Sequence, residues 1–333
     1  MKTRSFSAAP LIAAVIMVLA AGCGNAAATA ASAKPEDPSI TVAAIPAADL
    51  AGLYIALADG LFTRQGLHVT IRQIPSSQAV IADQLKGQVD ISAGSFIPYI
   101  SAQAAGARFH ILAEASTLAP NTRALVVTGN SRVTAVARLA GKKIGVNGTD
   151  SIGTLLVSML LSAHGISPRK VTFVTDPGGF PAMPRQLKDG DWDAAFLAEP
   201  YITAAGEDYG EQMLADLDQG AAFNLPIDGY LATQAWAQQH PKTEAAFTRA
   251  IEQGQAIANS NASAVQAAMA QYDNLPSQIT AAIALTGYPV GPVVEASIQR
   301  VAKAMLEFGI LGRQDNADVE QQTLIHSMVS PVS

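Results

Sequence analysis

The chain has 333 residues, of which 14% are charged and 49% are hydrophobic, and much of the apolar share is alanine. This composition is typical of a well-packed globular protein with a bland surface, and the length allows two domains with full hydrophobic cores. A net charge of −6 without any lysine–arginine cluster argues against nucleic acid or an anionic membrane surface as a partner.

The first 22 residues have the pattern of an export signal. Lys2 and Arg4 give a positive start, and residues 11–19 form an apolar run that is too short to cross a bilayer. Small residues then lead into Cys23, the only cysteine of the chain. We predict a signal peptide over residues 1–22 and, over residues 23–38, a flexible tether rich in alanine, serine and proline.

Cys23 is the predicted point of lipid attachment. The residues before it resemble the lipobox of bacterial lipoproteins, in which the signal is cut before the cysteine and the thiol carries diacylglycerol. The resemblance implies a lipid anchor, with palmitate among its acyl chains, at the outer face of the cytoplasmic membrane. A lone cysteine in an exported chain does not suit a disulfide framework. The alternative is an ordinary cleaved signal with an incidental cysteine.

Behind the tether, strand-like and helix-like segments alternate in two similar rounds. The first round predicts strands at residues 40–45, 68–74, 89–93 and 109–115, with helices at 51–59, 77–86 and 96–105. The second round predicts strands at 143–146, 171–174 and 194–197, with helices at 152–164 and 181–188. From residue 234 onward the pattern predicts only helices, at 234–240, 243–261, 262–272, 277–285 and 293–308, and we assign them no ligand role.

The two rounds form an internal repeat. Leu85-Lys86-Gly87-Gln88-Val89-Asp90 matches Leu187-Lys188-Asp189-Gly190-Asp191-Trp192-Asp193 with one extra residue. Each round is a βαβαβ unit, which builds an open parallel sheet with helices on both faces. We therefore predict an α/β fold of two parallel-sheet lobes. Ligands of open sheets bind outside the carboxyl ends of the strands, so a cleft lined by strand-to-helix loops should lie between the lobes.

Several segments carry a resemblance to a known family. They are residues 54–66, residues 85–90, residues 139–146, Asp193-Ala194-Ala195 and Glu199-Pro200. Together they resemble the solute-binding proteins of nitrate, sulfonate, taurine and thiamine-pyrimidine-precursor importers, over most of residues 40–235. The resemblance implies a bilobal periplasmic-binding-protein fold (type II) with a hinge of two crossings. It also implies a receptor that delivers a small polar solute to an ABC permease and its ATPase.

The hinge is expected where an element has just ended and glycine, asparagine or proline allows a change of direction. Residues 128–131 and 226–229 meet this description. Lobe I would then comprise residues 39–128 and 229–333, and lobe II residues 129–228. The C-terminal helices are expected to pack back on lobe I.

The candidate ligand-binding residues fall in the loops at the cleft-facing strand ends. From lobe I they are Asp49, Ser76, Ser77, Ser95, Phe96 and Thr117, and from lobe II Asn147, Thr149, Ser151, Phe180, Glu199 and Tyr201. The serines and threonines at helix N-termini could accept an oxyanion without an arginine, because the free N–H groups there carry partial positive charge. The alternative is that these residues are simply helix caps.

Other candidates point to other ligands. Carboxylates at predicted loop or hinge positions, which attract an amine or a ring N–H, are Asp49, Asp150, Glu199 and Asp228. A zwitterion would suit this mixture of acidic and oxyanion-binding groups. Three aromatic residues could instead stack on a heteroaromatic ring such as an aminopyrimidine, or could simply be packing residues: Phe96, Phe180 and Tyr201. The sequence leaves the ligand open.

We expect a monomeric binding protein and not an enzyme, with no cofactor, no metal and no catalytic residue. The five histidines are scattered, and none has a second ligand at metal spacing or a nucleophile motif nearby. Because folds of this type also support enzymes, an extracytoplasmic enzyme remains an alternative. A ligand-sensing module for a membrane kinase is another.

Overall fold

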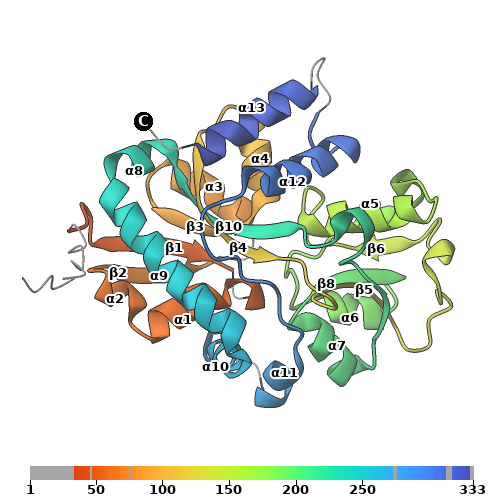
Figure 1. Ribbon diagram of the computed structural model, residues 1–333. Coiled ribbons are helices and arrows are strands. Elements are labelled where there is room, and N and C mark those ends of the chain that lie inside the picture. The colour runs from red at the N-terminus through yellow and green to blue at the C-terminus, as the bar shows by residue number, and fades with distance from the viewer. Residues whose placement is uncertain (1–33, 46, 75–76, 273–275, 313–316, 331–333) are drawn as a thin grey trace, which may run out of the picture. The chain divides into compact units, whose positions relative to one another are not determined.

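The structure, a computed structural model, describes residues 34–45, 47–74, 77–272, 276–312 and 317–330, apart from the side chains of residues 317–319 (Figure 1). The described residues lie in one compact unit, Ala33–Ser333. The expected signal peptide, most of the tether including Cys23, and Ser76 lie outside the described residues. Within the described ranges, no helix is long and apolar enough to cross a membrane.

Two five-stranded sheets form the framework. The first has the strand order β2-β1-β3-β10-β4, with β1 Ser39–Ala44, β2 His68–Gln73, β3 Ile91–Ser95, β4 Phe109–Thr117 and β10 Pro226–Thr233. The second has the order β7-β6-β8-β5-β9, with β5 Arg123–Val127, β6 Lys143–Gly145, β7 Thr172–Val174, β8 Ala194–Ala198 and β9 Gln212–Asp216. The two orders are equivalent strand by strand. This equivalence confirms the predicted repeat and the α/β fold of two lobes.

Each sheet contains one strand that runs against the others. β10 is antiparallel to β3 and β4, and β5 is antiparallel to β8 and β9, whereas the remaining pairs are parallel. The sheets are therefore mixed and not purely parallel as expected. The chain enters β5 and β10 directly from the other lobe, so no crossover helix is needed before these strands.

The chain crosses between the lobes earlier than expected. β4 belongs to the first sheet and β5 to the second, so the first crossing is residues 118–122 and not 128–131. The return crossing is residues 217–225, because residues 226–229 already pair with β4 or β3 in the first sheet. The first lobe thus comprises the first sheet and its helices, and β5 belongs to the second lobe.

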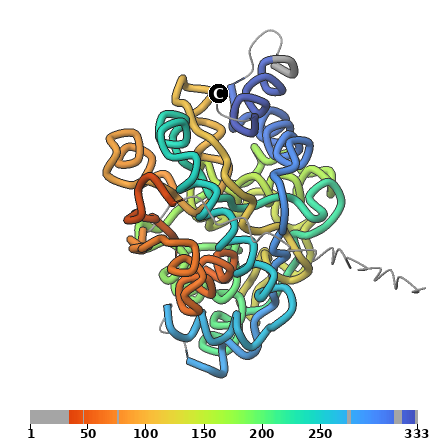
Figure 2. The backbone as a smooth tube through the Cα atoms, turned by 60° about the vertical axis from the view of Figure 1, so that its left-hand side comes forward, coloured from red at the N-terminus to blue at the C-terminus, as the bar shows by residue number. Residues whose placement is uncertain are grey.

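Helices cover the sheets (Figure 1). In the first round they are α1 Ala51–Ala58, α2 Leu61–Arg64, α3 Ser77–Leu85 and α4 Phe96–Ala104, and in the second α5 Ile152–Ala163, α6 Met183–Lys188 and α7 Tyr201–Tyr209. The C-terminal helices are α8 Gln234–Gln239, α9 Pro241–Ser260, α10 Ala262–Tyr272, α11 Ser277–Ala282, α12 Glu295–Glu307 and α13 Ala317–Val329. As predicted, C-terminal helices pack on the first lobe: α9, cyan in Figure 2, contacts α1, and α12 contacts α4.

The strands nearest the cleft are buried because helices cover both faces of their sheets. All five residues of β8 are buried, as are the first four of β3. Such strands are short continuous apolar or small-residue runs, which is why the sequence pattern identifies them. A helix follows each of these strands after at most two residues, α4 after β3 and α7 after β8. The fold thereby brings the strand-to-helix loops of both lobes together.

Candidate functional site

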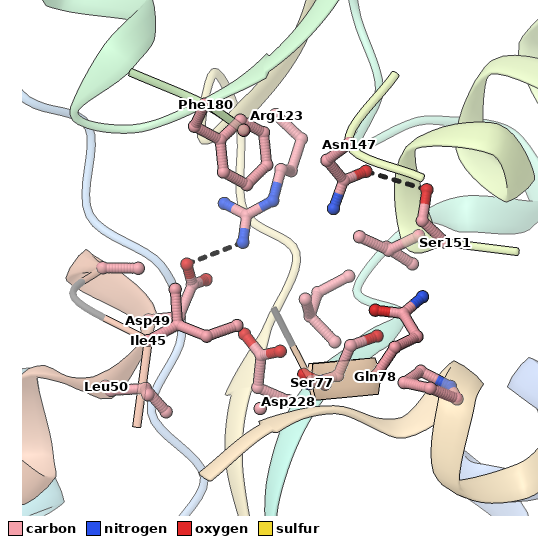
Figure 3. A pocket seen from close by; sticks show the side chains of 17 residues that line it. Ile45, Asp49, Leu50, Ser77, Gln78, Arg123, Asn147, Ser151, Phe180 and Asp228 are labelled. Carbon is pink, nitrogen blue, oxygen red and sulfur yellow. Dashed lines mark hydrogen bonds and ion pairs between the residues drawn. The ribbon is translucent and has the colours of Figure 1, made fainter. Parts of the chain in front are cut away.

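A cavity of about 70 Å³ lies between the two lobes (Figure 3). Its lining residues come from both lobes and include two residues at the start of β10. They are Ile45, Ala47, Asp49, Leu50, Ser77, Gln78, Gly94, Ser95, Pro98, Arg123, Asn147, Ser151, Ile152, Gly179, Phe180, Ile227 and Asp228. The lining combines an apolar wall with hydroxyls, amides and three charged groups.

A buried ion pair joins the lobes at this cavity. Arg123, the first residue of β5, places Nη2 2.6 Å from Oδ2 of Asp49, which lies in the 3₁₀ helix Ala48–Leu50 of the first lobe. The side chains are 5% and 3% exposed. Asp49 Oδ1 and Arg123 Nε are also buried, and neither has a hydrogen-bond partner among the described residues. The pair therefore leaves one acceptor and one donor unused.

A second carboxylate, Asp228, lies beside this pair (Figure 3). It is near the start of β10, and its Oδ2 accepts a hydrogen bond from Ser116 Oγ at 3.2 Å. Burial, followed by the negative charge of Asp49, raises the pKa of Asp228 to about 7, although Arg123 and the Ser116 hydroxyl act in the opposite direction. Asp228 can thus change its charge near neutral pH.

Three helices begin at the cavity. Ser95 caps α4 by accepting from the Ile97 N–H at 3.4 Å, and Ser151 caps α5 by accepting from the Thr154 N–H at 3.4 Å. Ser77 opens α3, and its hydroxyl accepts from the Ser95 N–H at 3.0 Å. Gly94 permits this contact, because a Cβ there would overlap the Ser77 hydroxyl. Ser95 and Ser151 are therefore helix caps, and the same helix ends also line the cavity.

Amide groups complete the polar lining. The Ser151 hydroxyl lies 2.8 Å from Asn147 Oδ1, which also accepts from the Gly153 N–H at 3.2 Å. Gln78 Nε2 donates to the carbonyl oxygen of Asp150 at 3.1 Å. Gln78 belongs to the first lobe and Asp150 to the second, so this hydrogen bond also closes the cavity across the lobes.

The apolar wall is partly aromatic. The Phe180 ring lies 5.8 Å from the Tyr201 ring at an interplanar angle of 13°, a stacked arrangement. Phe180 lines the cavity, and Tyr201 is not part of the lining. Aliphatic side chains on the other sides include Ile45, Leu50 and Ile227. A ligand in this space would meet both apolar and polar surfaces.

The structure brings together six of the described candidate residues at the cavity. They are Asp49, Ser77, Ser95, Asn147, Ser151 and Phe180. Five other candidates do not line it: Phe96, Thr117, Thr149, Glu199 and Tyr201. Ser76 and the lipid-attachment candidate Cys23 lie outside the described residues.

The local structure explains why four of these five lie elsewhere. Phe96 is fully buried against Gly229, Thr117 exchanges backbone hydrogen bonds with Gly287, and Thr149 is exposed. Glu199 lies at the end of β8, but its carboxylate accepts from the Thr203 N–H at 3.1 Å, the Thr203 hydroxyl at 2.9 Å and the Ala284 N–H at 3.2 Å. Glu199 therefore binds the first turn of α7 and the segment after α11, and burial raises its pKa.

Two polar lining residues were not singled out among the candidates. Gln78 directly follows the candidate Ser77, and Arg123 opens the buried strand β5. The only sequence signal for Arg123 is a charged residue at the edge of an apolar run, Arg123-Ala124-Leu125-Val126-Val127. That signal does not show that the residue pairs with an aspartate 74 positions earlier.

Comparison with solved structures gives the same two-lobed architecture. The alkanesulfonate-binding protein SsuA of Xanthomonas axonopodis pv. citri, bound to MOPS, matches with a TM-score of 0.70 at 19% identity, over 84% of this chain and 96% of that chain. The periplasmic aliphatic sulphonate-binding protein SsuA of Escherichia coli matches with a TM-score of 0.69 at 22% identity, over 86% and 92%. The periplasmic nitrate-binding protein NrtA of Synechocystis PCC 6803 matches with a TM-score of 0.74 at 15% identity, over 87% and 88%.

These structures share the bilobal fold, so the periplasmic-binding-protein fold class predicted from the sequence is confirmed. A comparison with curated proteins gives no match. A family model described as NMT1/THI5 like matches residues 47–264. This match covers more than half of the chain and most of the cavity-lining residues, and the chain belongs to the NMT1/THI5-like family.

Proposed function

We propose that the chain is an extracytoplasmic solute-binding receptor, which captures a small polar solute between its lobes and delivers it to an ABC importer. The observation that carries the proposal is the cavity, which lies between the lobes and takes its polar groups from both of them. The relatives of the same fold that bind alkanesulfonate or nitrate support the role.

Capture follows from contacts that a ligand makes with both lobes at once. A solute held by Ser77 and Ser95 on one side and by Asn147 and Ser151 on the other favours the closed arrangement, because only that arrangement provides all these contacts. Gln78 and Asp150 add a hydrogen bond across the entrance when the lobes are together. The closed form would be the form that docks on the permease, and the partner ATPase would drive uptake.

The ligand classes that we propose are a sulfonate, taurine or nitrate on one hand and an aminopyrimidine on the other. The helix N-termini suit an oxyanion, whereas the carboxylates and the Phe180 ring suit an amino-substituted ring. Among the described residues that line the cavity there is no histidine, lysine or cysteine, which favours binding over catalysis. A monomer, held at the outer face of the cytoplasmic membrane through a lipid on Cys23, completes the proposal.

A thermal-shift screen of the full-length protein tests this function. The panel contains taurine, alkanesulfonates, nitrate and aminopyrimidines, and a ligand of the native state must raise the melting temperature. We expect a rise with at least one class. Ser151→Ala should reduce the rise, whereas Ser167→Ala, which removes the exposed serine cap of the 3₁₀ helix Pro168–Lys170, should not. A panel without any rise contradicts the proposal.

A further inference from the structure

The cavity lining carries more acidic than basic side chains, with Asp49 and Asp228 against Arg123. Arg123 supplies the positive charge of the lining, and its Nη2 is already committed to Asp49. Asp228 then remains as an acid whose described side-chain contact is the Ser116 hydroxyl. A second unused acceptor, Asp49 Oδ1, lies buried in the same cluster. The free acceptors in this part of the cavity therefore belong to acidic side chains.

The other groups around Asp228 do not supply a compensating positive charge. From its own strand, Tyr230 stays neutral, because burial and the nearby Asp228 charge raise the tyrosine pKa well above its ordinary value. Tyr288 also stays neutral beside Asp49, for the same physical reason. Glu199 is a further acid that is close enough to interact with Arg123. One guanidinium thus interacts electrostatically with three carboxyl groups, those of Asp49, Asp228 and Glu199.

We propose that Asp228 is the specificity-determining residue of the cavity, which makes the site select a ligand with a cationic hydrogen-bond donor, an ammonium or amidinium nitrogen, over a ligand that is only an oxyanion. This inference rests on the proposed function. It restricts the proposed ligand classes to those that carry a cationic donor. An oxyanion at Arg123 would have to reach the buried Nε or displace Asp49, and in either place it would lie close to the charge of Asp228, which costs free energy in a buried site. A cationic donor meets Asp228 and Asp49 Oδ1 without breaking the ion pair.

The preference for a cationic over an anionic ligand should increase with pH. The pKa of Asp228, raised by burial and by Asp49, means that the carboxyl is largely neutral below about pH 7 and ionised above it. A cation binds the ionised form better and releases the proton when it binds at lower pH. Affinity for a cation should therefore rise with pH, and affinity for an anion should fall.

Two small test ligands of opposite charge measure this preference. Ethylammonium and ethanesulfonate share an ethyl group and differ in the charged group that they present to the lining. Calorimetry on the full-length protein at about pH 8 should show ethylammonium binding about 10- to 100-fold more tightly, the range expected for a hydrogen bond to a charged group. At about pH 5.5 this ratio should fall by about tenfold.

Asp228→Asn should abolish both the preference and its pH dependence. Asparagine keeps an acceptor for the Ser116 hydroxyl and removes the charge. Asp208→Asn is the control, because it removes the charge of an exposed aspartate on α7 that does not line the cavity. The control should keep the wild-type ratio at both pH values.

The outcomes separate this inference from the proposed function. If ethanesulfonate binds the wild type as tightly as ethylammonium, or if Asp228→Asn keeps the preference, the inference is overturned while the receptor function stands. If neither test ligand binds and the thermal-shift panel is also negative, both fail. Should Asp228→Asn not fold, the wild-type ratio at the two pH values decides, and a ratio that does not change overturns the inference.

Discussion

Glu211 is a buried acid that does not line the proposed binding cavity. It lies between α7 and β9, it is 7% exposed, and neither carboxylate oxygen has a hydrogen-bond partner in the part of the chain that the structure describes. Burial raises its pKa to about 8. The folded protein therefore holds this carboxyl in its neutral form at pH 7, whereas the unfolded chain ionises it near its ordinary pKa.

Glu211→Gln should therefore stabilise the protein at alkaline pH. Between the unfolded and folded pKa values the folded state binds the extra proton, so the wild type loses stability as the pH rises from about 4.5 to about 8. Glutamine does not ionise, and denaturant unfolding at about pH 8.5 should give a gain of about 1 to 3 kcal/mol that disappears near pH 4.5. Glu207→Gln, exposed on α7, should change nothing. A gain of equal size at both pH values would contradict the assigned cause.

The residues of the site differ in how far the sequence reveals them. Ser77, Ser95 and Ser151 were predicted because a serine between a strand and a helix occupies a fixed position at the helix start. Glu199 had an equally good position in the sequence, yet its carboxylate turns to Thr203 and Ala284. Arg123 could not be predicted, because its role depends on a partner from another lobe. Local position predicts which residues cap helices, and tertiary packing decides which residues meet.

At the scale of elements, a close helix–helix contact of the first lobe joins α1 and α9. Gly52 on α1 faces Gly254 on α9, and a Cβ on Gly254 would overlap the carbonyl oxygen of Gly52. The Phe62 and Phe247 rings stack nearby, with centroids 5.4 Å apart. Since the obstacle at Gly254 is backbone, it cannot move aside as a flexible side chain would. This crossing fixes the C-terminal helices against the lobe that carries Asp49.

Gly254→Ala should destabilise the protein by about 1 to 3 kcal/mol, because the added methyl forces two helix backbones apart. Urea unfolding measures the loss. Gly206→Ala in α7 is the matched control, since its Cβ would meet nothing closer than 3.7 Å. That substitution should be neutral or should stabilise by about 0.5 to 1 kcal/mol through helix propensity. Equal effects of the two substitutions would show that the crossing is not tight.

Elements with a strong local pattern were predicted well, and elements defined by long-range pairing were not. β1, β3, β6 and β8 were expected within a residue or two of their observed bounds. β5 was missed because the chain enters it from the other lobe without a crossover helix, and β9 was missed because it is a partly exposed edge strand. β10 was missed for the same reason as β5, and its residues 226–229 were interpreted as a crossing. The antiparallel strands β5 and β10 make the two sheets mixed. Because β5 already belongs to the second sheet, the first crossing lies earlier than predicted.

At the scale of the whole unit, two lobes share an interior that contains a buried ion pair. Asp49 belongs to the first lobe and Arg123 to the second, and both side chains are almost completely buried. Removing two charges from water costs several kcal/mol, which their attraction recovers only while both partners are present. The pair therefore contributes little net stability, but it makes each partner dependent on the other lobe.

This dependence can be measured with a double-mutant cycle. Arg123→Met leaves Asp49 and Asp228 buried together without their positive neighbour, so it should destabilise the protein by about 3 to 5 kcal/mol. Adding Asp49→Asn should restore a large part of this loss, because the uncompensated charge is then removed.

The stability of the single variant Arg123→Met should also depend on pH. It should fall as the pH rises, whereas a salt-bridged acid makes the stability of a protein rise with pH. Without Arg123, which lowers the pKa of Asp228 in the wild type, burial raises this pKa further above its unfolded value, so the loss of stability should be larger at about pH 8 than at about pH 5. Arg138→Met, which removes an exposed arginine of the second lobe, is the control and should stay within about 0.5 kcal/mol. If the double variant is no more stable than Arg123→Met, the guanidinium stabilises the protein through contacts other than Asp49, and the two lobes are not linked through this pair.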